Sequence, residues 1–188
     1  MRAYRVLNNQ KFSNQEFSII PIRYEDRMAI LKWRNEQVYH LRQNQLLTEK
    51  DQEHYFYNII NKLYDQEQPN QILFSYLEND ICIGYGGLVR VNWVDKNAEI
   101  SFIMNTELEK NYFSKHWTIF LQLIEQVAFK ELNLYKLFTY AFDQRPHIYE
   151  VIESSGFVKE ARLKKHYFFN GVYKDVIIHS KFNKFDPF

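Results

Sequence analysis

The sequence lacks several features that mark secreted or membrane-bound proteins. It contains one cysteine, Cys82, so no intramolecular disulfide can form. Cys82 lies in an apolar run, and we expect a small buried side chain there rather than a reactive thiol. No uninterrupted apolar stretch approaches the ~20 residues of a membrane span, and no apolar signal region follows Met1. These absences predict a cytoplasmic protein without a membrane partner.

The sequence also lacks a strong excess of one charge. It has 24 Lys and Arg residues against 23 Asp and Glu residues, which gives a formal net charge of +1. The basic residues are spread along the whole chain, whereas nucleic-acid-binding proteins usually carry them on one clustered face. No nucleic-acid partner is therefore predicted. The histidines show no ligand spacing to Asp, Glu or Cys, so we also predict no metal site.

What is present fits one folded domain. A chain of 188 residues with 46% hydrophobic residues can bury a sizeable core. Residues 1–15 are polar and rich in Asn and Gln, and we expect a loose N-terminal arm there. The domain itself is expected to cover residues 16–182.

The apolar periodicity of the domain predicts alternating strands and helices. Expected strands cover residues 16–23, 71–77, 81–91, 98–104, 136–141, 157–169 and 172–180. Expected helices begin at Asp26 and at Thr48, where Thr48 and Asp51 resemble a capping box, and cover residues 114–132 and 147–155. Asn170-Gly171 is a strong hairpin signal. This order predicts an α/β protein in which helices flank a mixed sheet.

Four groups of segments resemble known sequences when they are taken in order. They are residues 22–23 (IR) with 33–35 (WRN), 83–88 (IGYGGL) with 98–102 (AEISF), 128–137 (AFKELNLYKL), and 156–163 (GFVKEARL) with 170–175 (NGVYKD). Together they resemble the GNAT acetyltransferases, in the branch that contains ribosomal-protein N-terminal and sugar-amine acetyltransferases. The resemblance implies a mixed, mostly antiparallel sheet with one splayed strand pair and flanking helices.

The resemblance also implies a reaction, the transfer of an acetyl group from acetyl-CoA to a primary amine by direct attack. The strand that contains Glu99 is expected to splay from strand 136–141, and the pantetheine arm of the cofactor lies in the resulting wedge. Glu99 is the expected base for the ammonium proton. The sequence leaves open a structural role, in which this carboxylate bonds a neighbouring backbone amide. The residues expected to bind pantetheine through their main chain are Ile100, Ser101, Phe102, Ile103 and Met104.

The sequence departs from the family at the turn that binds the CoA pyrophosphate. The family usually has glycines there, at the start of the long helix, so that backbone amides can cradle phosphate. The corresponding stretch, residues 109–117, contains no glycine, which makes close backbone approach difficult. We expect phosphate at a helix N-terminus near Ser114, assisted by Lys110, Lys115 or His116.

A second departure follows the short strand. The family often has Asn at the position of Arg145 and a Tyr general acid near Ile152, and this sequence has neither. We place Asp143 and Arg145 with the cofactor, and expect His147 or Tyr149 to protonate the leaving thiolate. The alternatives are that Tyr149 faces the core and that His147 caps its helix.

The amine acceptor should lie opposite the cofactor, against the first two helices and the last hairpin. An aromatic groove with arginine suits a nucleotide-linked amino sugar, because a base can stack and a phosphate can pair. A protein N-terminus fits nearly as well, and a small-amine acetyltransferase or a GNAT-fold binding module without activity are further alternatives. Monomer and homodimer both remain open. Expected wall residues are Trp33, Arg34, Asn35, Arg42, Tyr55 and Trp93.

Overall fold

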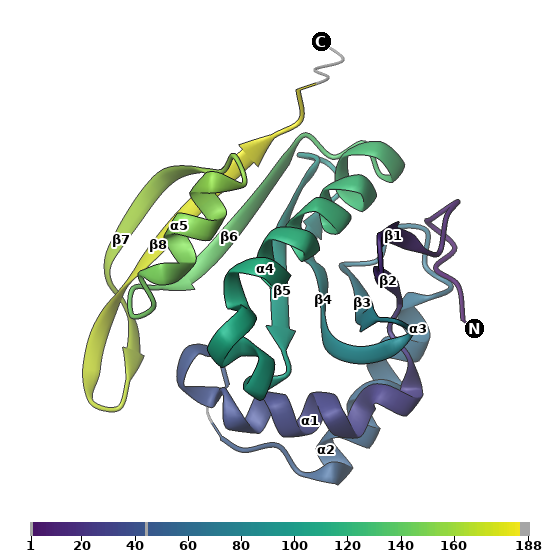
Figure 1. Ribbon diagram of the computed structural model, residues 1–188, viewed down its shortest axis with the longest axis horizontal. Coiled ribbons are helices and arrows are strands. Elements are labelled where there is room, and N and C mark those ends of the chain that lie inside the picture. The colour runs from purple at the N-terminus through teal and green to yellow at the C-terminus, as the bar shows by residue number, and fades with distance from the viewer. Residues whose placement is uncertain (1, 44, 185–188) are drawn as a thin grey trace.

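A computed structural model of the protein describes residues 2–43 and 45–184. Eight strands form one sheet in the order β1-β2-β3-β4-β5-β6-β8-β7 (Figure 1). They are β1 (Phe12–Asn14), β2 (Phe17–Pro21), β3 (Gln71–Glu78), β4 (Ile81–Asn92), β5 (Asn97–Met104), β6 (Lys136–Phe142), β7 (Val158–Phe169) and β8 (Val172–Phe182). Neighbouring strands are antiparallel except for the parallel pair β5 and β6.

Helical segments cover the sheet, and α4 and α5 lie in front of it in Figure 1 while α1 and α2 lie below. The segments are η1 (Tyr24–Asp26), α1 (Arg27–Glu36), η2 (Val38–His40), α2 (Glu49–Tyr55), η3 (Phe56–Ile60), α3 (Asn61–Leu63), α4 (Thr106–Glu125), η4 (Gln126–Glu131) and α5 (His147–Ser154). The mixed α/β arrangement expected from the sequence is confirmed. None of the described helices is both long and apolar enough to cross a membrane.

Helix α4 supplies the apolar layer on one face of the sheet. Its residues Phe120, Leu121 and Ile124 are fully buried, as their spacing of three and four residues predicts. The Phe120 ring stacks on Phe102 of β5, with ring centroids 4.0 Å apart. This contact fixes the position of α4 over the middle of the sheet.

The expected loose arm is wrong, because the first residues pack into the core. Tyr4, Leu7 and Phe12 are buried, and β1 pairs with β2 at the edge of the sheet. The Tyr4 hydroxyl donates to the carbonyl oxygen of Leu73 and accepts from the Leu73 amide, both at 3.0 Å. Three buried side chains and the hydrogen bonds of the Tyr4 hydroxyl therefore hold this polar segment against the core.

Two helix starts differ in detail from the expectation. Helix α4 begins at Thr106, where the Asn105 side chain accepts a hydrogen bond from the Glu107 amide and caps it, and the expected start near Ser114 corresponds to the helical stretch after a kink. The helix is bent at Tyr112, where φ is −126° and ψ is 16°. Asp26 precedes α1 as expected, but its side chain makes no cap bond there.

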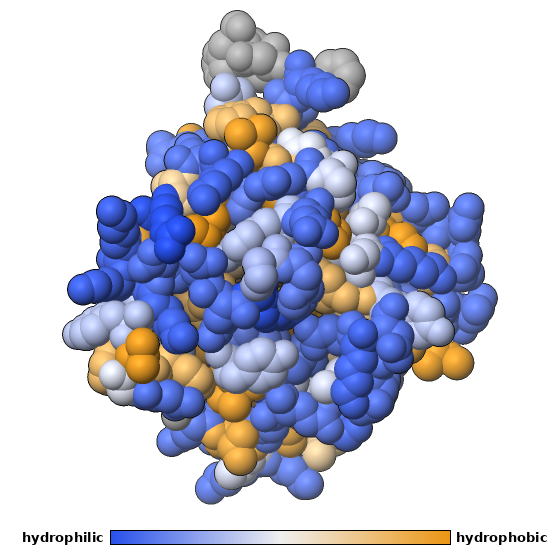
Figure 2. Space-filling view, turned by 60° about the vertical axis from the view of Figure 1, so that its left-hand side comes forward, coloured by the Kyte–Doolittle hydropathy of each residue, from blue (hydrophilic) through white to orange (hydrophobic). Residues whose placement is uncertain are grey.

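Other local signals are confirmed. Thr48 and Asp51 form the capping box of α2. Asn170 and Gly171 both have positive φ, at 47° and 76°, as a tight β7–β8 hairpin turn requires. On the face drawn in Figure 2, hydrophilic side chains predominate and hydrophobic ones lie scattered among them.

Candidate active site

The site is built where β5 and β6 separate. The two strands pair only at Asn97–Lys136, Ala98–Leu137 and Glu99–Phe138. Beyond Glu99, β5 continues to Met104 beside β4 but has no strand on its β6 side among the described residues. The main chain of β5 therefore offers free donors and acceptors to the space between the strands, which Figure 1 shows as a widening gap.

A cavity of about 330 Å³ occupies this divergence. Trp117 of α4 forms part of its wall without closing it. Met104 does not line it, because this residue is buried and its carbonyl oxygen accepts a hydrogen bond from Gln37. The expected site residues that do line it are Arg34, Arg42, Glu99, Ile100, Ser101, Phe102, Ile103 and Arg145.

Strand alternation decides which side chains of β5 face which helix. Phe102 faces α4, where its ring meets Trp117 edge-on at 5.3 Å. Ile103 is paired with Tyr85 of β4, and the Tyr85 hydroxyl accepts a hydrogen bond of 2.6 Å from Arg34 of α1. Because residues two apart share a face, Glu99 lies on the α1 side of the sheet with Ile103.

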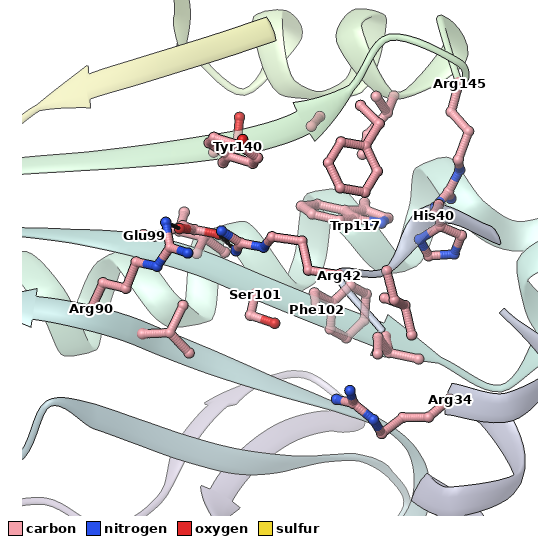
Figure 3. Close-up of a pocket in the computed structure, with 18 residues that line it drawn as sticks. Arg34, His40, Arg42, Arg90, Glu99, Ser101, Phe102, Trp117, Tyr140 and Arg145 are labelled. Carbon is pink, nitrogen blue, oxygen red and sulfur yellow. Dashed lines mark hydrogen bonds and ion pairs between the residues drawn. The ribbon is translucent and has the colours of Figure 1, made fainter. Parts of the chain in front are cut away.

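Glu99 is buried at the narrow end of the cavity, with only 2% of its surface exposed. Its Oε1 atom is ion-paired with Arg42, and its Oε2 atom lies 3.4 Å from Nη1 of Arg90 (Figure 3). Within the part of the chain that the structure describes, Oε2 has no hydrogen-bond donor. The side chain thus has a cationic neighbour at each oxygen, and Oε2 is the oxygen that accepts no hydrogen bond from the described residues.

The opposite end of the cavity carries Arg145 and His40, as Figure 3 shows. Arg145 is ion-paired with Glu109 of α4, and its guanidinium carbon lies 5.2 Å from the Phe113 ring centroid. Burial, together with the charge of Arg145, lowers the pKa of His40 to about 3. His40 is therefore neutral at physiological pH.

The structure does not place the expected general acids at the cavity. Tyr149 donates a 3.0 Å hydrogen bond to Asp143 and stacks on the buried His179, with ring centroids 5.2 Å apart. Burial raises the pKa of its hydroxyl. His147 is exposed and meets the Phe113 ring at 4.9 Å. Asp143 likewise lies outside the cavity lining, so only Arg145 of this cluster reaches it.

The residues expected to hold phosphate are also dispersed. Lys110 pairs with Glu107 at 2.8 Å, and Lys115 Nζ lies 4.8 Å from the Phe17 ring centroid on β2. Ser114 is exposed, and His116 is buried 3.2 Å from the Tyr76 hydroxyl. None of these four lines the cavity. Residues 114–116 follow the kink at Tyr112, where a second helical stretch begins, but the side chains of Lys115 and His116 contact Phe17 and Tyr76 on the sheet instead of the cavity.

Three of the expected wall residues have structural partners elsewhere. Trp33 is buried in the core, and Trp93 donates to the carbonyl oxygen of Pro69 at 3.0 Å. The Asn35 side chain bonds both the amide and the carbonyl group of Leu47 at 2.8 Å, which holds the segment that leads into α2.

Tyr55 lies in a second cavity of about 410 Å³ beside α1 and α2. Tyr85 and several apolar side chains line it, and burial raises the pKa of Tyr55 to about 12. Arg34 lines both this cavity and the first one, so it is a shared wall between them.

Sequence reasoning missed four polar residues that line the first cavity, namely His40, Arg90, Thr139 and Tyr140. The Tyr140 ring lies under two cations, with the guanidinium carbons of Arg42 and Arg90 at 4.7 and 5.9 Å from its centroid. Thr139 is buried, and its hydroxyl has no hydrogen-bond partner among the described residues. The arginine at position 90 lay inside an expected strand, and nothing in that pattern aimed it at Glu99.

The profile of the acetyltransferase (GNAT) domain matches residues 19–178. The chain belongs to the GNAT acetyltransferases. This match covers most of the sequence and agrees with the splayed strands and the cavity between them. No curated protein sequence matches the chain.

Solved structures of acetyltransferases share this fold. The spermidine N-acetyltransferase from Vibrio cholerae, in complex with CoA and spermine, aligns with a TM-score of 0.79 and 20% identity, over 90% of this chain and 97% of that chain. A dodecameric structure of that enzyme in an intermediate state gives a TM-score of 0.73 and 20% identity, over 90% and 95%. A crystal structure described as a putative acetyltransferase aligns with a TM-score of 0.68 and 15% identity, over 93% of this chain and 87% of that chain.

Proposed function

We propose that this GNAT protein transfers an acetyl group from acetyl-CoA to a primary amine, with Glu99 as the base. Family membership supports the reaction class. The observation that carries the role of Glu99 is its buried Oε2 atom, which has no hydrogen-bond donor among the described residues and only the Arg90 guanidinium beside it, at 3.4 Å. A buried carboxylate oxygen without a donor is costly, and an incoming ammonium group would satisfy it.

The residues around the cavity fit acetyl-CoA as the donor. The free edge of β5 beyond Glu99 can pair with the amide groups of a pantetheine arm, as an added strand would. Arg145 at the outer end supplies positive charge toward the phosphates, although Glu109 offsets part of it. When bound, the cofactor supplies the activated acetyl group.

The chain's own residues then have three tasks. Glu99 takes the proton from the acceptor ammonium, which frees the nitrogen lone pair for attack. Arg42 holds the carboxylate at the narrow end through its ion pair. The apolar wall of Phe102 and Trp117 excludes water, which strengthens both interactions.

Two acceptor classes follow from the resemblance, an amino sugar of surface-glycan synthesis and a protein N-terminus. The cavity supports an acceptor that enters from the α1 side, because Glu99 and Arg34 both lie there. Small amines such as the spermine bound in the Vibrio cholerae structure are the alternative.

The first test is thermal denaturation with and without acetyl-CoA. A ligand that binds only the native state raises the melting temperature, and the shift grows with concentration. We expect a rise with acetyl-CoA and amine-dependent release of CoA thiol when primary amines are added. No shift at millimolar acetyl-CoA would favour the binding module without activity.

A further inference from the structure

The acceptor side of the cavity carries more positive than negative charge. Arg34, Arg42 and Arg90 line it, and Glu99 is the only acidic residue in its described lining. Arg34 is bonded to neutral groups, the Tyr85 hydroxyl at 2.6 Å and the Gln43 side-chain oxygen at 3.2 Å. One carboxylate therefore faces three guanidinium groups, and this imbalance attracts anions.

Arg90 reaches this side through an irregularity in β4. Up to Val89 the strand pairs regularly with β5, and Val89 is opposite Glu99. Regular alternation would send the next side chain to the opposite face, where Leu88 is fully buried. The register shifts after Val89, and Arg90 adopts a φ of 51°, in the left-handed region. This bulge aims its guanidinium at Glu99 instead.

Seven other described non-glycine residues, among them Lys96 and Lys165, also have positive φ, so this conformation alone marks no site. It matters at Arg90 because it turns the side chain toward Glu99. The Arg90 side chain remains 61% exposed, and its one described anionic partner is Glu99 at 3.4 Å. The bulge thus presents a largely solvent-accessible cation beside the proposed base.

Arg42 completes the arrangement from the segment between α1 and α2. Its guanidinium lies over Tyr140 and pairs with the other oxygen of Glu99. Arg42 and Arg90 therefore converge from two elements on one carboxylate and one aromatic ring, as Figure 3 shows. These two guanidinium groups carry two positive charges against the single negative charge of Glu99, so their remaining charge and N–H donors can bind a second anion.

We propose that Arg42 and Arg90 form an anion clamp for the acceptor, so that the amine substrate carries a phosphate or carboxylate group close to its nitrogen. The inference rests on the proposed function and narrows its substrate class. The ammonium group takes the Glu99 oxygen that lacks a hydrogen-bond donor, while the anionic substituent pairs with the two guanidinium groups and draws Arg90 away from that oxygen. A polycation without an anionic group has no partner for them and is repelled.

The test titrates sodium phosphate, sodium acetate and spermidine at constant ionic strength, with melting temperature as the readout. Each titration is run with and without saturating CoA. The variants are Arg90→Gln, which removes the charge, Arg90→Lys, which keeps it, and Arg5→Gln as a matched control. Arg5 is similarly exposed, at 65%, and pairs with Glu67 away from the cavity.

We expect phosphate or acetate to stabilise the CoA-bound protein with an apparent Kd that rises at least fivefold in Arg90→Gln. Arg90→Lys should retain most of the effect, and Arg5→Gln should match the native protein. The stronger of the two anions identifies the substituent. Equal anion effects in the native protein and Arg90→Gln, or stabilisation by spermidine, would overturn the clamp.

The titration with saturating CoA distinguishes phosphate bound by the clamp from phosphate bound where the cofactor's own phosphates would lie. If CoA abolishes the phosphate effect, the two arginines serve the cofactor and the inference is wrong. If CoA itself gives no shift, the proposed function fails, whereas the anion titration without CoA still reports on the clamp.

Discussion

Glu99 and Phe138 form the last residue pair that joins β5 to β6. The carboxylate therefore lies where the sheet begins to open, at the narrow end of the cavity. At this position the Glu99 carboxylate would contact a molecule bound between the two strands, and the burial of Glu99 keeps competing water away.

Glu99→Gln should lower the rate of acetyl transfer by about a hundredfold or more, because glutamine cannot accept the ammonium proton. The stabilisation by CoA should persist, since the edge of β5 is unchanged. Steady-state release of CoA thiol measures the effect. Glu107→Gln is the control, because that carboxylate is exposed and pairs with Lys110 on α4. Near-native turnover in Glu99→Gln would remove this residue from the role of base.

His40→Gln should make the protein less sensitive to mild acid. The folded pKa of His40, about 3, lies below its unfolded value of about 6.5, so the unfolded chain binds the proton first. The native protein therefore loses stability as the pH falls below about 6.5, by about 1–2 kcal/mol from this group at pH 5. Calorimetric unfolding between pH 7.5 and 5 should show a shallower decline in the variant. Parallel declines would contradict the prediction.

Tyr4→Phe should destabilise the fold by about 1–3 kcal/mol, although the residue lies in a polar N-terminal segment. The substitution leaves the buried Leu73 amide without its hydrogen-bond acceptor. The Leu73 carbonyl oxygen keeps a second donor, the amide of Ile22 at 3.0 Å. Denaturant unfolding measures the loss, and Tyr57→Phe, at a residue that is 73% exposed, serves as control. Equal stability of both variants would show that the segment is not anchored by this hydroxyl.

Gly86→Ala should destabilise the sheet beside the cavity by about 1–3 kcal/mol, through overpacking. An added Cβ would lie 2.2 Å from the Ser101 carbonyl oxygen and 2.9 Å from the Phe120 ring. Thermal unfolding should show a drop of several degrees. Gly171→Asn is the control, because nothing lies within 4 Å of that position and asparagine tolerates its positive φ. An unchanged melting temperature for Gly86→Ala would refute the close approach.

The sequence was sufficient to predict the elements whose cause is local. The Thr48 capping box, the Asn170-Gly171 turn and the buried stripe of α4 depend on neighbouring residues only. The divergence after Glu99 was expected from the resemblance to the family and not from periodicity. Glu99, Arg42 and Arg34, all named from the sequence, line the cavity at this divergence, and their roles stay predictions.

The rest of the site depends on the directions in which individual side chains point, and the spacing of residues along the sequence does not determine those directions. Tyr149 and His116 were chosen by residue type and position, but each side chain points to a buried aromatic partner on the sheet. Arg90 required the bulge in β4, and that bulge is a property of two paired strands. His40 reaches the cavity from η2, and its cationic neighbour there, Arg145, is distant in sequence.

The short junction between β5 and β6 also has a mechanical consequence. Among the described residues, main-chain pairing between the sub-sheet β1–β5 and the sub-sheet β6–β8–β7 is confined to residues 96–99 and 135–138. A molecule that hydrogen-bonds to β5 beyond Glu99 and also contacts β6 would therefore restrict the movement of one sub-sheet relative to the other. Amide hydrogen exchange in β6 and β8 should then slow far beyond the residues that the molecule touches.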